Sequence, residues 1–210
     1  LDASRYPHLR FSFITNGSLV TEKRWAQISH LNLYSMNVSL DAARADTYAE
    51  IRVNGKWDHI LERVRFLIER RDAGDYEQFI LNMTVMRQNH DQLVEFVKLG
   101  LELNVDVIYF QWLHSYPEFS ISDPIDWKAL QTLEKQLADP VMNEKRVDKN
   151  GISEWWKWLP IQLEGPVTVN EAREKFVAAY VFNVAAAITG NRDKETLMRM
   201  WAKWARKHGD

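Results

Sequence analysis

The sequence predicts an α/β protein with a parallel sheet, followed by a mostly helical C-terminal part. Over roughly the first 115 residues, short apolar segments rich in β-branched and aromatic residues alternate with segments of helical period. This alternation is typical of βαβ units and a parallel sheet. Beyond that point the alternation stops and helical periodicity dominates.

Four segments have the composition and length of strands, at residues 10–15, 34–40, 78–86 and 105–110. The segments between them place apolar residues at i, i+3 and i+4, at residues 21–31, 57–68 and 93–103. Right-handed crossovers place such helices on one face if the sheet curls like a barrel, and on both faces if it is doubly wound.

The second half, residues 116–210, begins with a proline-containing loop and a helix expected at 126–137. Residues 139–151 are charged and lack periodicity, so we expect an exposed excursion there. Two further helices are expected after Thr168 and Asp193, joined as a hairpin. Before them, Trp155, Trp156 and Trp158 are expected to pack this segment onto the sheet, with stacking on a base or sugar as the alternative.

Composition excludes several classes of function. The 27 Lys and Arg against 29 Asp and Glu give a formal net charge of −2, which excludes a broadly basic nucleic-acid binder. The absence of cysteine excludes a disulfide, a thiolate zinc site and a cysteine-ligated iron–sulfur cluster within this sequence. The six histidines show no metal-ligand spacing, so we predict no metal site. With no secretory signal and no apolar run near the ~18–20 residues of a membrane span, we expect a cytoplasmic protein without membrane partners.

Polar residues recur near the carboxyl ends of the expected strands, where parallel α/β proteins bind ligands. Asn37 and Ser39 share one face of their strand by period two, as do Asn82 and Thr84 of the next. Inward polar groups cost free energy unless they bond to each other, to water or to a ligand. The pattern therefore predicts either a self-satisfied polar cluster or a ligand site.

Four strings in order resemble the middle of a radical S-adenosylmethionine (SAM) domain. They are FITNGSL at 13–19, VSLD at 38–41, YAEIR at 48–52, and NMTV at 82–85 followed by Asn89. Their order and spacing match strands three to six of that family's partial (β/α) barrel across roughly residues 5–113, about half of the chain. The subgroup resembled includes molybdenum-cofactor biosynthesis enzymes and peptide-modifying maturases. The resemblance implies a partial (β/α) barrel at 1–115 and a helical C-terminal extension at 116–210.

The chain departs from the family at its defining feature. The three-cysteine loop that binds a [4Fe–4S] cluster is absent, as is the glycine-rich motif that holds the SAM amino group. We expect both in sequence before Leu1, which makes this chain a fragment; a naturally degenerate relative is the alternative. The intact parent would reductively cleave SAM at its cluster and drive radical chemistry on an unknown substrate. This chain alone is expected to bind neither cofactor and to be inactive.

The resemblance implies roles for eight residues in binding the cofactor. Thr15 would lie beside SAM, Ser39 would contact its ribose, and Asp41 would order that strand tip. Arg52 would meet the SAM carboxylate, which suits a bidentate donor, with a surface ion pair as the alternative.

The remaining four residues lie on the next two strands. Asn82 and Thr84 would face the centre of the cavity, and Gln111 to Leu113 would border the adenine. For Thr84 and Gln111, plain structural polarity explains the residue equally well.

A second class of function remains open, namely a non-catalytic binding or scaffold module with a half-barrel fold. Without two preceding strands, residues 10–15 would form an exposed sheet edge. We expect that edge to be covered by the C-terminal segment, swapped with another copy, or paired edge to edge. Self-association is therefore expected.

Overall fold

The computed structural model describes residues 8–113, 118–121 and 126–152. The tryptophan cluster at 155–158 and the two helices expected after it lie outside the described residues. Five strands form one sheet: β1 (Phe11–Thr15), β2 (Leu33–Ser39), β3 (Gln78–Val85), β4 (Val107–Trp112) and β5 (Val147–Lys149). The helices are α1 (Glu22–Trp25), α2 (Ala45–Ile51), α3 (Trp57–Asp72), α4 (Leu93–Glu102) and α5 (Trp127–Leu137), with a 3₁₀ turn η2 at Pro140–Asn143.

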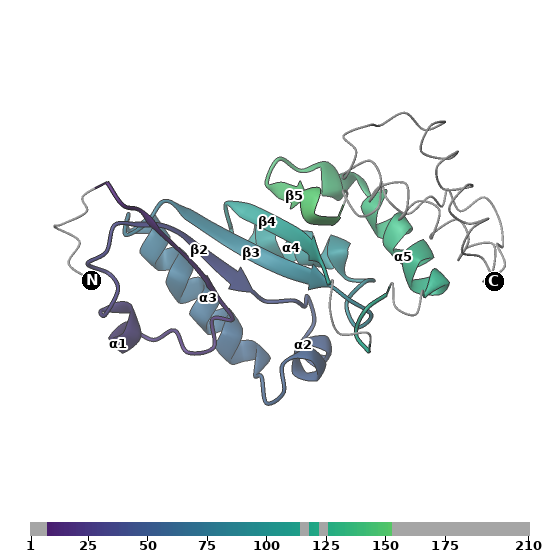
Figure 1. Ribbon diagram of the computed structural model, residues 1–210, viewed down its shortest axis with the longest axis horizontal. Helices are drawn as coiled ribbons and strands as arrows, with labels where there is room; N and C mark the ends of the chain where they lie inside the picture. Colours follow the sequence, from purple (N-terminus) through teal and green to yellow (C-terminus); the bar gives the residue numbers. More distant parts are fainter. Residues whose placement is uncertain (1–7, 114–117, 122–125, 153–210) are drawn as a thin grey trace, which may run out of the picture. The chain divides into compact units, whose positions relative to one another are not determined.

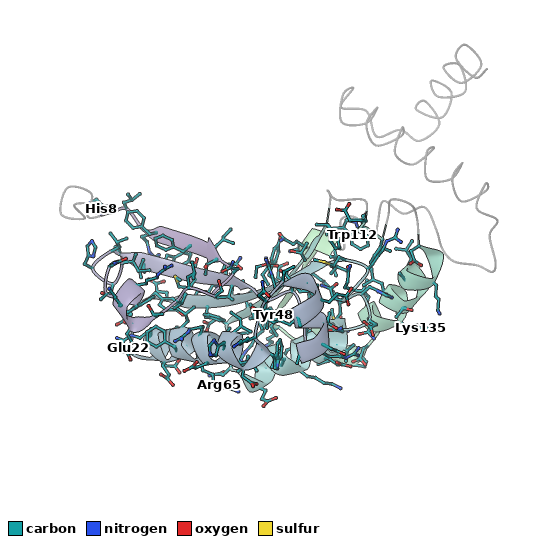
Figure 2. All side chains as sticks on the ribbon, turned by 90° about the horizontal axis from the view of Figure 1, so that it is seen from below. His8, Glu22, Tyr48, Arg65, Trp112 and Lys135 are labelled. Carbon is teal, nitrogen blue, oxygen red and sulfur yellow. The ribbon has the colours of Figure 1, made fainter. Side chains whose placement is uncertain are left out.

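The strands lie in the order β1-β2-β3-β4-β5, and every neighbouring pair is parallel (Figure 1). The α/β prediction is therefore confirmed. In this order no strand position is skipped, whereas a doubly wound sheet reverses its order at a switch point. Figure 2 shows the helices below the sheet and the strands above it. The arrangement is that of part of a (β/α) barrel.

The face of the sheet that packs on the helices is apolar. On β3, Phe79, Leu81 and Met83 are fully buried, and Leu67 of α3 and Phe96 of α4 are fully buried as well. Burying each such side chain contributes about 1.5–3 kcal/mol. This layer is the core that holds the strand tips in place.

Gly17 joins the tip of β1 to the helix layer. Its φ of +72° favours glycine, and a Cβ there would lie 2.9 Å from Ile60 Cδ1 and 3.2 Å from Val38 Cγ1. The turn after β1 can therefore pack this closely on α3 only with glycine.

The expected excursion at 139–151 was wrong in part. It contains η2 and the short strand β5, which pairs with β4 through Ile108–Val147 and Tyr109–Asp148. The sheet thus takes its fifth strand from the segment that the sequence placed in the helical part. The Val-Asp-Lys tripeptide of β5 is too short and too charged to show a strand pattern, and its pairing with β4 creates the strand.

The first expected helix, at 21–31, is also shorter than its periodicity predicts. Helix α1 ends at Trp25, and residues 26–30 continue as hydrogen-bonded turns. Thr21 caps α1 by accepting the N–H of Arg24.

Candidate functional site

The open face of the sheet carries rows of polar side chains that cross neighbouring strands. Ser39 of β2 pairs with Asn82 of β3, and Asn82 pairs with Tyr109 of β4. One step closer to the carboxyl edge, Thr84 pairs with Gln111. Paired residues of parallel strands share a face, so these side chains lie on the side away from the helices.

Asp41 is the centre of the carboxyl edge. It follows β2, is 2% exposed, and has a φ of 60°, a left-handed conformation that Asp tolerates better than most residues. Its Oδ1 accepts the backbone N–H of Thr84 at 2.8 Å, and its Oδ2 accepts the Ser39 hydroxyl at 2.8 Å. The carboxylate therefore ties the tip of β2 to β3.

Arg52 completes this network from the end of α2. Its Nη2 forms an ion pair with Asp41 Oδ2 and lies 3.3 Å from both the carbonyl oxygen and the hydroxyl of Ser39. The Arg52 side chain is 33% exposed while Asp41 is buried, so Arg52 forms an ion pair, as the alternative interpretation expected, but with a buried carboxylate. The guanidinium is held at the rim of the open face.

Asn89 connects the ends of β2 and β3 at the same edge through its side-chain amide. It is fully buried and its amide donates to the carbonyl oxygens of Asp41 at 2.8 Å and Thr84 at 2.9 Å. Its Oδ1 accepts the N–H of Met86 at 2.8 Å. One side chain thus satisfies three backbone groups and fixes the tips of β2 and β3 against each other.

The structure brings five of the eight predicted residues into one hydrogen-bonded or paired set, namely Ser39, Asp41, Arg52, Thr84 and Gln111. Within it, Gln111 donates its amide to the Thr84 hydroxyl at 2.9 Å, so both show the structural polarity that the sequence left open. Asn82 lies beside the set through its pairing with Ser39. Their contacts with a cofactor remain predictions.

The structure does not bring Thr15 and Leu113 into this set. Thr15 pairs with Val38, whose side chain belongs to the fully buried core, and its hydroxyl accepts the Gly17 N–H at 3.1 Å. Thr15 therefore lies on the face of the sheet that packs on the helices, opposite the row of polar side chains. Leu113 continues β4 by donating its N–H to Val85 at 3.3 Å.

Within the described part of the chain, three buried polar atoms near the open face have no hydrogen-bond partner: Asn37 Oδ1, Asn82 Oδ1 and Arg52 Nε. Such groups cost about 1–3 kcal/mol each when unsatisfied. Amide oxygens suit ligand hydroxyl or amino groups, and a guanidinium suits a carboxylate. This donor and acceptor set would suit a ligand that carries both hydroxyl groups and a carboxylate.

An iron–sulfur cluster does not fit the residues present. The sequence holds no cysteine, and the part of the chain that the structure describes has no group of three or more His, Cys, Asp or Glu that could hold a metal. Thiolates are the usual ligands of a [4Fe–4S] cluster.

Two tyrosines near this edge escaped the sequence analysis. Tyr109 faces the open side between Asn82 and Asp148, and counting by two from Gln111 would have found it. Tyr48 of α2 lies near Arg52 and Asp41; burial raises its pKa, while the Arg52 charge lowers it. In the sequence, Tyr48 appeared only as the first residue of the YAEIR string, with no role of its own.

Among the described helices, none has the length and apolar character needed to cross a bilayer.

Comparisons with known proteins found no matching family model. The chain is 31% identical over 100 residues to the mycofactocin maturase MftC of Mycolicibacterium smegmatis, covering 48% of this chain and 24% of that protein. It is 27% identical over 128 residues to a GTP 3′,8-cyclase of Geobacter sulfurreducens, covering 60% and 36%. It is 24% identical over 111 residues to the molybdenum cofactor biosynthesis protein moc-5 of Caenorhabditis elegans, covering 52% and 18%. The chain therefore spans less than two fifths of the length of each of these curated relatives.

Proposed function

We propose that this chain belongs to the radical SAM superfamily, as its similarity to a mycofactocin maturase and to GTP 3′,8-cyclases supports, and that its open sheet face forms part of the SAM site of such an enzyme. The observation that carries the proposal is the convergence of Ser39, Arg52 and Asn82 at one carboxyl edge. Two of these residues keep a buried polar atom without a partner, Asn82 Oδ1 and Arg52 Nε.

The roles follow from what each side chain already contacts. Asp41 holds the Arg52 guanidinium and the Ser39 hydroxyl in place, so the donors that face a ligand are oriented before it binds. The Nε of Arg52 remains free to meet a carboxylate, and the Asn82 oxygen remains free to accept from a ribose hydroxyl. SAM supplies radical chemistry when it is reduced by a [4Fe–4S] cluster.

A cluster held by thiolates requires cysteines from outside these 210 residues. We therefore expect this chain alone to be inactive in reductive SAM cleavage. Anaerobic reconstitution with iron and sulfide should give no thiolate-cluster absorbance near roughly 410 nm. A stoichiometric cluster would overturn this part of the proposal.

Weak SAM binding by the chain tests the site itself. The sequence alone predicts no bound cofactor in this chain; because the described residues line part of a cavity with side chains already in place, we propose instead weak binding with a Kd of about 1 mM, which leaves negligible occupancy at micromolar SAM. Saturation-transfer NMR with the 210-residue chain measures it. Ser39→Ala should weaken binding about fivefold through the lost hydroxyl contact and the loosened Asp41 carboxylate.

Ser12→Ala is the matched control. Ser12 pairs with Ser35 at the other end of the sheet, and their hydroxyls lie 2.8 Å apart. This variant should bind SAM as the native chain does. Equal losses in both variants, or no saturable signal from a folded chain at about 10 mM SAM, would contradict the proposal and favour a non-catalytic module.

A further inference from the structure

A cleft of about 330 Å³ lies between the loop after β1, helix α2 and the first two turns of α3. Its polar groups come from Ser18, Tyr48, Asn54, Lys56, His59 and Arg63. None of the residues that line it is Asp or Glu. The cleft therefore combines positive charge with neutral hydrogen-bonding groups.

The basic side chains follow the helical period. Lys56, His59 and Arg63 are spaced i, i+3 and i+7, which places them along one side of α3. Among the described residues, Lys56 and His59 form no ion pair, and the carboxylate nearest to Arg63 is that of Glu62 at 3.9 Å. The protein thus leaves the charge of this cleft largely uncompensated.

Tyr48 adds a hydrogen-bond donor to the lining of this cleft. It is 4% exposed and lines the cleft, yet its hydroxyl bonds to no other described residue. Tyr76 is equally buried, at 3%, and donates its hydroxyl to the Leu67 carbonyl at 2.7 Å. The Tyr48 hydroxyl is not among the polar atoms of the described residues that are shielded from solvent without a partner, so it reaches solvent and is available to an acceptor that is not protein.

The start of α3 adds to the same field. Lys56 is its N-cap residue and makes no side-chain capping bond. The first N–H groups of this 16-residue helix therefore lack a side-chain acceptor, and the helix dipole favours an anion there.

A second cleft on α3 serves as an internal comparison. It is lined by Lys23, Arg63 and Arg65 but also by Glu22, Glu62 and Glu69, so its charges balance. Arg63 lines both clefts, and of the two only the first has a lining with basic residues and no carboxylate.

We propose that the cleft between α2 and the start of α3 binds the phosphate group of a phosphomonoester. The dianion would accept from the Tyr48 and Ser18 hydroxyls and pair with Lys56 and Arg63, the donors that phosphate prefers. The proposal goes beyond SAM binding, because none of these residues makes a hydrogen bond or an ion pair with the Asp41 carboxylate.

Titration of the ¹⁵N-labelled chain with ribose 5-phosphate, followed by amide chemical shifts, tests the proposal. We expect saturable shifts around residues 18, 48 and 56–63 with a Kd of about 1 mM, and none with ribose. Inorganic phosphate is the second arm: a weaker Kd than that of the ester assigns the site to phosphorylated small molecules, and an equal Kd assigns it to free phosphate.

Variants of the chain distinguish specific binding in the cleft from non-specific attraction of the phosphate to basic residues. The double change Lys56→Gln and Arg63→Gln should raise the Kd at least about tenfold, and Tyr48→Phe about threefold. The matched control Lys23→Gln with Arg65→Gln removes the same charge from the balanced cleft and should leave the Kd unchanged. Circular dichroism melting shows that each variant is folded.

Three results would overturn the proposal: no saturation at about 20 mM phosphoester, equal losses in the control pair, or shifts of equal size with ribose. The Lys56 and Arg63 variant should still bind SAM like the native chain. A failure of this site is therefore distinguishable from a failure of the SAM site.

Discussion

Adjacent residues of β3 lie in opposite environments. Phe79, Leu81 and Met83 are fully buried on the face that packs on the helices, whereas Ile80 and Thr84 lie on the open face and are half-buried. The covered face is built of apolar contacts that need nothing further. The open face keeps buried amide oxygens without partners, so it is completed only by something outside the described residues. The same strands thus devote alternate residues to stability and to binding.

Removing a large side chain from each face of β3 in turn is the strongest test of the difference between the two faces. Phe79→Ala should lower the free energy of unfolding by about 3–5 kcal/mol, through lost burial and the cavity left behind. Ile80→Ala, on the open face one residue later, should cost less than about 1.5 kcal/mol, because its neighbours are half-open. Urea denaturation measures both. Similar losses would mean that the open face is packed like a core.

The carboxyl edge tests whether the two faces are coupled. Asn89→Ala leaves the carbonyls of Asp41 and Thr84 and the N–H of Met86 without their partner. We expect a loss of about 2–3 kcal/mol in urea denaturation, the cost of burying unsatisfied backbone groups. Asn16→Ala is the control, since the Asn16 side chain accepts only from the exposed Ser18 and should matter by less than about 1 kcal/mol. An equally small effect of Asn89→Ala would show that the strand tips do not depend on its bonds.

The period-two pattern explains how much of this organisation could be predicted. Apolar and polar residues alternate along 78–85 except at Ile80, so the sequence identified both the strand and its two faces. The same reasoning predicted α3 and α4 and brought Ser39, Asn82 and Thr84 to one side. Local patterns suffice where a side chain's environment depends only on its own strand or helix.

Tertiary partners could not be predicted in the same way. Arg52 and Asp41 are 11 residues apart; Asp41 was expected to order its strand tip and Arg52 to meet a carboxylate of the cofactor, and no local pattern predicted that the two would pair with each other. Thr15 was placed by its position at a strand end, whereas the register with Val38 sets its direction. The role of Asn89 depends on where two other strand tips lie, which no local pattern encodes.

The buried Tyr76 makes the stability of the covered face depend on pH in the alkaline range. Burial raises the pKa of Tyr76, which lies in the core and donates to the Leu67 carbonyl. At neutral pH, Tyr76→Phe should cost about 1 kcal/mol through this bond. Above about pH 10 the unfolded tyrosine ionises and the folded one does not, so native stability falls as pH rises. The phenylalanine variant lacks this loss, and its deficit should shrink. Urea denaturation of both proteins at several values between about pH 7 and pH 11 measures the difference in their free energies of unfolding. A difference that stays constant with pH would contradict this prediction.

The smallest change in stability is expected at the free edge of the open face. Ile14 is 77% exposed, and in the part of the chain that the structure describes β1 has a strand on one side only. We expect such an apolar edge to pair with another copy, and Ile14→Lys to prevent it. Sedimentation velocity at about 100 µM should show association of the native chain and a monomeric variant, with the free energy of unfolding changed by less than about 0.5 kcal/mol. A native chain that stays monomeric, or a variant that associates equally, would mean that the edge is already protected.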